Sequence, residues 1–250
     1  MRARISLREL VRAAYLGEPE TIKQCIAENV DGYIDFNASD DIFRSNAVSQ
    51  ASLSNHVNVL KVLQSVPGVD FNATEQKHRR TGLTLAAMED RVNSIEFLLG
   101  IPGIKINVAD KLGYTALMYA VLRSQLASLK ILLAVDSIEV NAIDQFGRTV
   151  LIYAAGSQAA NAPAIVDELL KRSDIDLHIV DNERGSALST AMRAGNYSIA
   201  FKLMKAQATA AIKGDRFYSQ NQNQLFSPIT LEEVIVEDDA QQLLRNKSIF

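Results

Sequence analysis

The sequence contains few of the residues from which catalytic or metal sites are usually built. It has one cysteine, Cys25, and three histidines, His56, His78 and His178, which fall in different repeats of the chain. One cysteine cannot form an internal disulfide, and a catalytic thiol would need a basic partner nearby. The spacings of zinc, phosphate-loop and serine-hydrolase motifs do not occur. We therefore expect no catalytic residue, no metal and no cofactor, and we expect Cys25 to be a buried thiol.

A large net charge and long apolar runs are also missing. The formal charge is −3 at pH 7, so no strong field attracts the chain to nucleic acid. No stretch approaches the roughly 18 apolar residues of a membrane span. The first residues, Met1 to Arg4, lead into an amphipathic pattern without the apolar core of a signal peptide. This favours a cytoplasmic location.

The sequence has instead a block that recurs about every 34 residues. The blocks begin at Thr81, Thr115, Thr149 and Ser186, so the steps are 34, 34 and 37 residues. Their sequences are TGLTLAA, TALMYAV, TVLIYAA and SALSTAM, and each is followed by a second apolar run. The longer third step places three extra residues within 156–164. A fixed period of this size is typical of stacked repeats, which bury their apolar faces only against their neighbours.

Each unit reads as two short helices. In the unit that starts at Thr115, Leu117, Ala120 and Val121 share one helical face, and Leu129 and Leu132 do so in the second run. Weaker copies of the block occur near residues 8 and 46, which gives six units. The dipeptides Pro67-Gly68 and Pro102-Gly103 predict turns after the second helices.

These blocks resemble the ankyrin repeat family over roughly residues 7–206. The family unit begins T-[PA]-L-H-x-A-A-x-x-G, and its hairpin ends in V-N-A with an Asp shortly after. The matching hairpin segments here are VDFNA, IKINV and IEVNA. The resemblance assigns the hairpin acid to the following residues: Asp41, Asp110, Asp144 and Asp181.

The sequence departs from the family at two positions of the unit. The family His is absent, and the residues in its place are Ser49, Thr84, Met118, Ile152 and Ser189. The Gly between the two helices occurs only at Gly17 and Gly195, with Asn55 in one further unit. Asn also tolerates the left-handed backbone of a helix end. We expect a stack that relies more on apolar packing than the family consensus does.

The resemblance implies a concave face lined by the hairpin tips and by exposed positions of the first helices. On the first helices these positions are Met88, Tyr119, Arg123, Tyr153 and Arg193. On the hairpins they are Arg79, Arg80, Tyr114, Phe146 and Arg148. Tyrosine and arginine often anchor interfaces, so we expect a partner protein to contact these residues. The alternative is that Tyr119 and Tyr153 cap the core and expose only their hydroxyls.

The basic run from Lys77 to Arg80 has two interpretations. It could meet an acidic peptide or a phosphate, or it could be an ordinary solvated loop. It is short and has no interleaved aromatic residues, which argues against nucleic acid.

Residues 207–250 depart from the period. A polar linker at 220–224 precedes Thr230-Leu231-Glu232-Glu233, which fits a capping box. One interpretation is a helix that caps the last unit. The other is a sorting signal, because the acidic cluster from Glu232 to Asp239 resembles the C-terminal signals of type IV secreted bacterial effectors. That reading would place the protein in a host cytosol.

The sequence thus predicts an all-α ankyrin-repeat solenoid of about six helix-turn-helix units over 1–206, followed by a cap or sorting tail over 207–250. We expect a monomer that binds a partner protein without catalysis. Two alternatives stay open: a secreted effector that engages a host protein, and an enzyme whose site lies outside the regular repeats.

Overall fold

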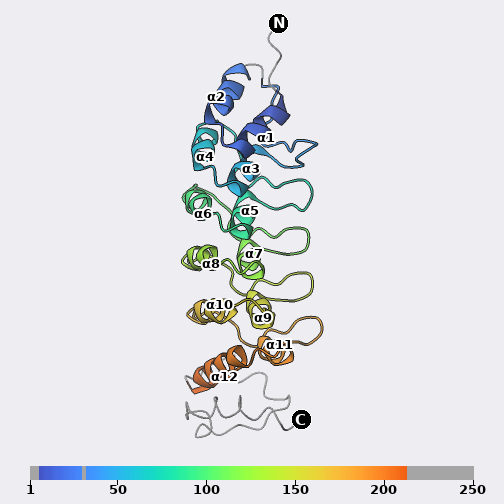
Figure 1. The fold of residues 1–250 in the computed structure, drawn as a ribbon, viewed down its shortest axis with the longest axis vertical. Coiled ribbons are helices and arrows are strands. Elements are labelled where there is room, and N and C mark those ends of the chain that lie inside the picture. The colour runs from blue at the N-terminus through green and yellow to red at the C-terminus, as the bar shows by residue number, and fades with distance from the viewer. Residues whose placement is uncertain (1–5, 30–31, 213–250) are drawn as a thin grey trace.

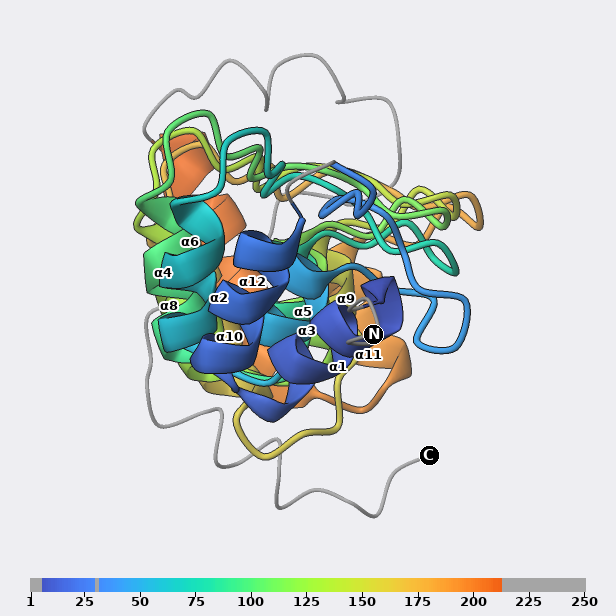
Figure 2. The same ribbon diagram turned by 90° about the horizontal axis from the view of Figure 1, so that it is seen from above.

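The computed structural model describes residues 6–29 and 32–212, which form one column of stacked helix pairs (Figure 1). The first helices of the units form one layer and the second helices form another, and the loops between units project on the side of the first helices (Figures 1 and 2). The described residues contain no strand, only two isolated bridges. The helices are α1 (Leu7–Leu16), α2 (Pro19–Glu28), α3 (Ala47–Leu53), α4 (Val57–Gln64), α5 (Gly82–Met88), α6 (Val92–Leu99), α7 (Ala116–Leu122), α8 (Leu126–Leu133), α9 (Val150–Gly156), α10 (Ala162–Leu169), α11 (Ala187–Arg193) and α12 (Tyr197–Ile212).

This confirms the predicted all-α solenoid of six units. The last helix, α12, continues to Ile212, beyond residue 206, where the sequence pattern places the end of the repeats. The predicted cap at Thr230–Glu233 and the acidic cluster up to Asp239 lie outside the described residues.

Every first helix begins at a side chain that caps it. The capping oxygen accepts a hydrogen bond from the backbone N–H three residues later, as in Thr115 with Met118. This satisfies one of the N–H groups that a helix start leaves without a partner. The capping residues are Ser6, Asn46, Thr81, Thr115, Thr149 and Ser186. The Ser or Thr that opens each recurring block therefore sets where its helix begins.

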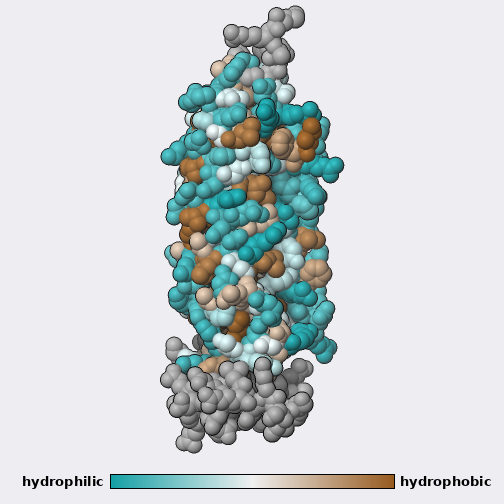
Figure 3. Space-filling model, viewed as in Figure 1, coloured by the Kyte–Doolittle hydropathy of each residue, from teal (hydrophilic) through white to brown (hydrophobic). Residues whose placement is uncertain are grey.

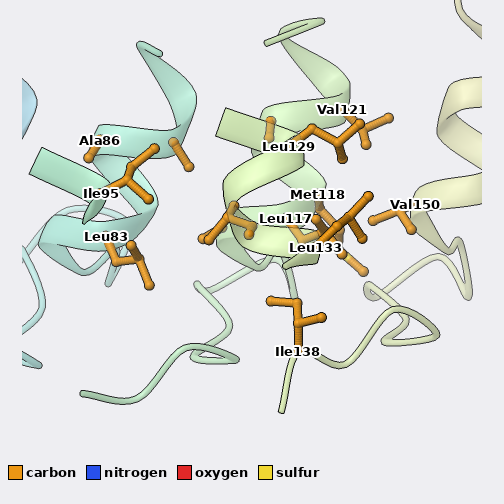
Figure 4. Close-up of a cluster of buried hydrophobic side chains, with 14 of the residues drawn as sticks. Leu83, Ala86, Ile95, Leu117, Met118, Val121, Leu129, Leu133, Ile138 and Val150 are labelled. Carbon is orange, nitrogen blue, oxygen red and sulfur yellow. The ribbon is translucent and has the colours of Figure 1, made fainter. Parts of the chain in front are cut away.

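The core runs without a break through the stack, because each helix pair buries its apolar face against the next one. Leu117 and Leu129 of one unit and Ile95 of the unit before it are fully buried, and Figure 4 shows this region in close-up. Met118 and Ile152 occupy the position of the family His and are buried as well. At these two positions apolar packing takes the place of the His.

Cys25 lies in this core, as the sequence predicts. It is buried on α2, and burial, with a smaller effect of the nearby Glu9 charge, raises the pKa of its thiol from 9.0 to about 11. The thiol is therefore protonated at neutral pH and serves as an apolar packing group.

Five of the six turns between paired helices use a left-handed residue, and only some of these residues are glycine. Gly17 and Gly195 have φ of 76° and 73°, and Asn55, Asp90 and Ser124 take the same position with φ between 54° and 61°. The prediction for Asn55 is confirmed. Asp90 and Ser124 have the same left-handed backbone, although neither is the Gly or Asn that predicts it.

Two of these residues cap the next unit. The Asp90 carboxylate accepts from the backbone N–H of Ser128 at 3.0 Å and from its hydroxyl at 2.6 Å. Asn55 accepts from the backbone N–H of Ser94 at 3.0 Å. The helices that receive these bonds, α8 and α6, have no cap from their own N-cap residue. The first turn of each is therefore capped by the preceding unit.

We expect Asp90→Ala to lower the free energy of unfolding by about 1–2 kcal/mol, as the loss of a helix cap usually does. The substitution also leaves the buried Ser128 hydroxyl without its acceptor. Asp90→Asn is the matched control, because the amide oxygen can still accept and Asn tolerates a positive φ. Urea unfolding of both variants checks this. Equal stability of Asp90→Ala and the unsubstituted chain would mean that the cap contributes nothing.

Candidate functional site

The candidate site is the face formed by the hairpin tips and the exposed side of the first helices, here called the hairpin face. On the side of the molecule in Figure 3, apolar side chains stand in small groups among polar ones. Large exposed apolar residues of the hairpin face include Ile42, Leu112, Leu122 and Phe146. Single apolar residues among polar ones are normal on a protein surface, so it is the arrangement of the hairpins that distinguishes this face.

Each hairpin is organised by a buried carboxylate at its base. The Asp110 carboxylate accepts from the backbone N–H groups of Leu112 and Tyr114 at 2.8 and 3.0 Å. Asp144 holds Phe146 and Arg148 in the same way. The carboxylate thus adds to the little backbone pairing of the hairpins, such as the bond from the Asp110 N–H to the Tyr114 carbonyl. The five acids are Asp40, Glu75, Asp110, Asp144 and Asp181.

The sequence prediction of Asp41 as the acid of the second unit is wrong by one residue. Asp40 accepts from the N–H groups of Ile42 and Phe43, whereas Asp41 is exposed. Although burial disfavours its charge, these bonds and the Arg8 guanidinium hold the pKa of Asp40 below its usual value. This hairpin is one residue longer than those of Asp110 and Asp144, so a count of five residues before the block gives the wrong position. The hairpin of Glu75 is also one residue longer, so a count of five residues before its block does not reach Glu75.

Neighbouring hairpin tips are joined by backbone hydrogen bonds. The N–H of Lys111 donates to the carbonyl of His78 at 2.9 Å, and the N–H of Gln145 donates to the carbonyl of Leu112 at 3.0 Å. Equivalent bonds join Gln76 to Arg44 and Asn182 to Phe146. The tips of the second to the sixth unit therefore form one continuous ladder.

Tyr119 is a structural residue of this face. Its hydroxyl donates to Asp110 Oδ2 at 2.7 Å, its ring is 6% exposed, and the Arg80 guanidinium lies 4.8 Å from the ring centre. Arg80 also approaches Asp110 Oδ2 at the ion-pair distance of 3.5 Å. Burial, and then the hydrogen bond to Asp110, raise the pKa of Tyr119 well above its usual value. For this residue the structure favours the alternative of a ring that caps the core.

Tyr153 repeats the arrangement one unit later. Its hydroxyl donates to Asp144, and Arg148 lies over its ring and approaches Asp181 at 3.6 Å. Burial and the bonds to Asp144 and Tyr114 raise the pKa of Tyr153 in turn. Tyr114 joins the two units, because its ring meets Tyr119 edge-on at 5.5 Å and its hydroxyl lies 3.2 Å from that of Tyr153. Tyr153 is half-buried and still reaches the surface.

The remaining predicted contact residues divide into buried and exposed ones. Met88 is 9% exposed and packs against Leu85 and Tyr119, so little of it is available to a partner. The side chains of Arg79, Arg123 and Arg193 are exposed and make no hydrogen bond or ion pair with any described residue. Phe146 is 42% exposed at its tip. The sequence analysis missed Arg44 and Ile42, because it placed the hairpin of the second unit, which contains Asp40, one residue out of register.

The hairpin face contains a cavity between α7, α9 and α11. Its volume is about 450 Å³, and Leu122, Ile152, Tyr153, Ser157, Thr190 and Arg193 line part of it. The turn between α9 and α10, residues 157–161, is longer than the turn of 123–125 between α7 and α8. Gly156 and Ser157, at the start of the segment in which the sequence predicts extra residues, line the cavity. The buried hydroxyl of Thr190 has no hydrogen-bond partner among the described residues.

Metal binding and membrane insertion find no support in the described part of the chain. No three His, Cys, Asp or Glu side chains of residues 6–29 and 32–212 gather closely enough to hold a metal ion. Among the same residues, no helix combines the length and the apolar character needed to cross a bilayer.

Comparison with known proteins places this fold in a family. The sequence matches the family described as ankyrin repeats (3 copies), over residues 10–110, 48–144 and 117–214. No curated protein matches it. The ankyrin repeat protein EF0377 is 20% identical with a TM-score of 0.68, and the match covers 80% of this chain and 98% of that one.

Two further solved structures are similar. A chain in the complex of the predatory endopeptidase Bd0816 from Bdellovibrio bacteriovorus with the immunity protein Bd3460 is 26% identical, with a TM-score of 0.66 and coverage of 80% of this chain and 99% of that one. The ankyrin repeat domain of Bcl-3, a member of the IkappaB family, is 22% identical, with a TM-score of 0.68 and coverage of 79% and 85%. The family match extends over most of the sequence. This chain therefore belongs to the ankyrin repeat family.

Proposed function

We propose that this chain binds a partner protein on its hairpin face and acts without catalysis. One observation carries the proposal: exposed side chains stand on a ladder of hairpins that is already joined tip to tip. Leu112 and Phe146 are exposed on adjacent rungs, and the bond from Gln145 to Leu112 fixes one rung to the next. Because the backbone is ordered in advance, little conformational entropy is lost on binding.

The cavity between α7, α9 and α11 would hold an anchor residue of the partner. A volume of about 450 Å³ lies within the usual range of binding pockets. Leu122 offers apolar contact, and the side chain of Arg193 is exposed without a partner among the described residues.

The similar proteins support binding to a protein. Ankyrin repeats generally serve as interaction modules, and one similar chain occurs in a complex between an endopeptidase and an immunity protein. The effector interpretation depends on the acidic cluster, which lies outside the described residues, and the hairpin face gives no observation that favours it.

Photo-crosslinking in cells that produce the chain tests the proposal. A benzoylphenylalanine is placed at Leu122 or Phe146 on the hairpin face, and at Lys61 or Glu96 on the exposed side of α4 or α6 as matched controls. We expect a specific protein adduct from Leu122 and Phe146 and none from Lys61 and Glu96. Adducts from the α4 and α6 positions alone, or from none of the four, would contradict the proposed face.

A further inference from the structure

The hairpins carry an unexpected residue at their left-handed position. In each of the five hairpins, the residue whose N–H donates to the carbonyl of the hairpin acid has a positive φ. Two hairpins have glycine there, Gly113 and Gly147, as a positive φ favours. The other three have arginine: Arg44, Arg79 and Arg184, with φ of 50°, 63° and 63°.

The two glycines are explained by close approach of the next hairpin. A Cβ on Gly113 would lie 2.8 Å from the Cα of Asp144, and one on Gly147 would lie 2.7 Å from the side chain of Asn182. The three arginines have room for a side chain but still occupy a backbone conformation that non-glycine residues rarely adopt, and arginine is not among the residues that tolerate it best.

The arginine side chains make no contact inside the described part of the protein that would offset this strain. All three are exposed, and none makes a hydrogen bond or an ion pair with the residues that the structure describes. Backbone hydrogen bonds hold this conformation, and residues kept in a rarely adopted conformation cluster at functional positions. The guanidinium groups are therefore available for a ligand outside the chain.

The charge around two of these arginines defines that ligand. The exposed charged residues on the tips of the second, third and fourth units are Arg44, Lys77, Arg79 and Lys111, with Asp41 as the one exposed acid of these described tips. The carboxylates inside these hairpins are buried and already accept hydrogen bonds from the loop N–H groups. This cationic patch stands on a chain whose net charge is −3. Arg184 differs, because the exposed Glu183 lies beside it.

The apolar tips continue directly from the cationic patch. Lys111 is followed by Leu112, which is 39% exposed, and the next tip presents Phe146. Neighbouring packed helices lie about 10 Å apart, which equals roughly three residues of an extended chain. A ligand that runs along the ladder would thus place acidic residues over the second to fourth units and apolar residues, about three positions apart, over the fourth and fifth.

We propose that the hairpin ladder recognises an extended acidic segment of a partner protein, flanked on one side by two spaced apolar residues. Arg44 and Arg79 bind its carboxylates, and Leu112 and Phe146 contact its apolar residues. This proposal rests on the proposed function and adds the chemical class of the partner. For the basic run it favours contact with an acidic peptide through Arg79, whereas Arg80 is engaged with Asp110 and Tyr119.

A peptide titration against the full chain tests this. The probe is a fluorescein-labelled peptide of about twelve residues, with four Asp or Glu followed by two Leu. The two Leu are three positions apart, because three residues of an extended chain span about the distance between neighbouring units. A second peptide with the reversed sequence tests the opposite chain direction. The decisive variant is Arg44→Gly with Arg79→Gly, because glycine adopts the backbone freely and the fold is kept. We expect its melting temperature to equal or exceed that of the unsubstituted chain and its affinity to fall about fivefold at low salt.

Three controls separate charge from structure. Arg44→Lys with Arg79→Lys keeps the charge and should retain most of the affinity. Arg184→Gly makes the same substitution in the same backbone conformation beside Glu183 and should change the affinity less than twofold. A peptide with Asn and Gln in place of its acids should bind weakly, and added salt should weaken the acidic peptide much more than the neutral one.

Several results would overturn the proposal. These are no binding of either peptide direction, equal affinity of the acidic and neutral peptides, unchanged affinity of the double glycine variant, or tighter binding of duplex DNA than of the peptide. Adducts from Leu122 and Phe146 together with any of these results would leave the proposed function standing and reject only the acidic partner.

Discussion

Asp110→Ala is expected to lower the free energy of unfolding by about 3–5 kcal/mol, the usual cost of breaking a buried charged network from one side. The carboxylate is almost completely buried. It accepts from Leu112, Tyr114 and Tyr119 and pairs with Arg80. Alanine would leave the two loop N–H groups without a partner and the Arg80 charge without its counterion. Urea unfolding followed by circular dichroism measures the loss.

Asp41→Ala is the matched control for this experiment. It also removes an aspartate from a hairpin, but Asp41 is exposed and makes no hydrogen bond with a described residue. A change within about 0.5 kcal/mol is expected, as for most surface substitutions. A similar loss in both variants would show that hairpin charge in general, and not the buried network, stabilises the stack.

Tyr119→Ala is expected to cost about 3–5 kcal/mol of stability, the usual range for a buried aromatic side chain. The ring fills the space between the Arg80 guanidinium and Tyr114. Tyr119→Phe keeps the ring and removes only the hydroxyl that Asp110 accepts from, so about 1–2 kcal/mol is expected. The difference between the two variants separates packing from hydrogen bonding.

A tyrosine on the last helix provides the control. Tyr197 is 59% exposed on α12, so Tyr197→Ala should change the stability by less than about 0.5 kcal/mol. If Tyr119→Ala proved as stable as the unsubstituted chain, the residue would be a surface residue in solution, and its assignment as a partner contact would regain support.

The repeat pattern was sufficient to predict the architecture. The Ser and Thr residues that open the blocks became helix caps, and the apolar positions such as Leu117 and Leu129 became the core. These features depend on neighbours in sequence or on a fixed helical period, which a single sequence displays directly.

The site was predicted less well, because its residues are defined by contacts across the period. Whether Tyr119 faces a partner or Asp110 depends on a hairpin nine residues earlier, and both arrangements fit the same helical position. The shift from Asp41 to Asp40 follows from one extra residue in a loop, which no helical period records. The left-handed arginines are invisible in sequence, since arginine is not a residue that signals a positive φ.

The caps that Asn55 and Asp90 provide have a consequence for how such a chain can grow or shrink by gene rearrangement. Both residues lie opposite a serine at the third position of the following helix, Ser94 or Ser128. Loss of the third unit, which contains α5 and α6, would bring Asn55 opposite Ser128 and preserve a cap. Loss of the next unit would bring Asp90 opposite α10, where alanine stands at that position and offers a backbone N–H but no hydroxyl in place of that of Ser128. The units are therefore not freely interchangeable, because the hydrogen bonds that a unit makes to the next one depend on which unit follows it.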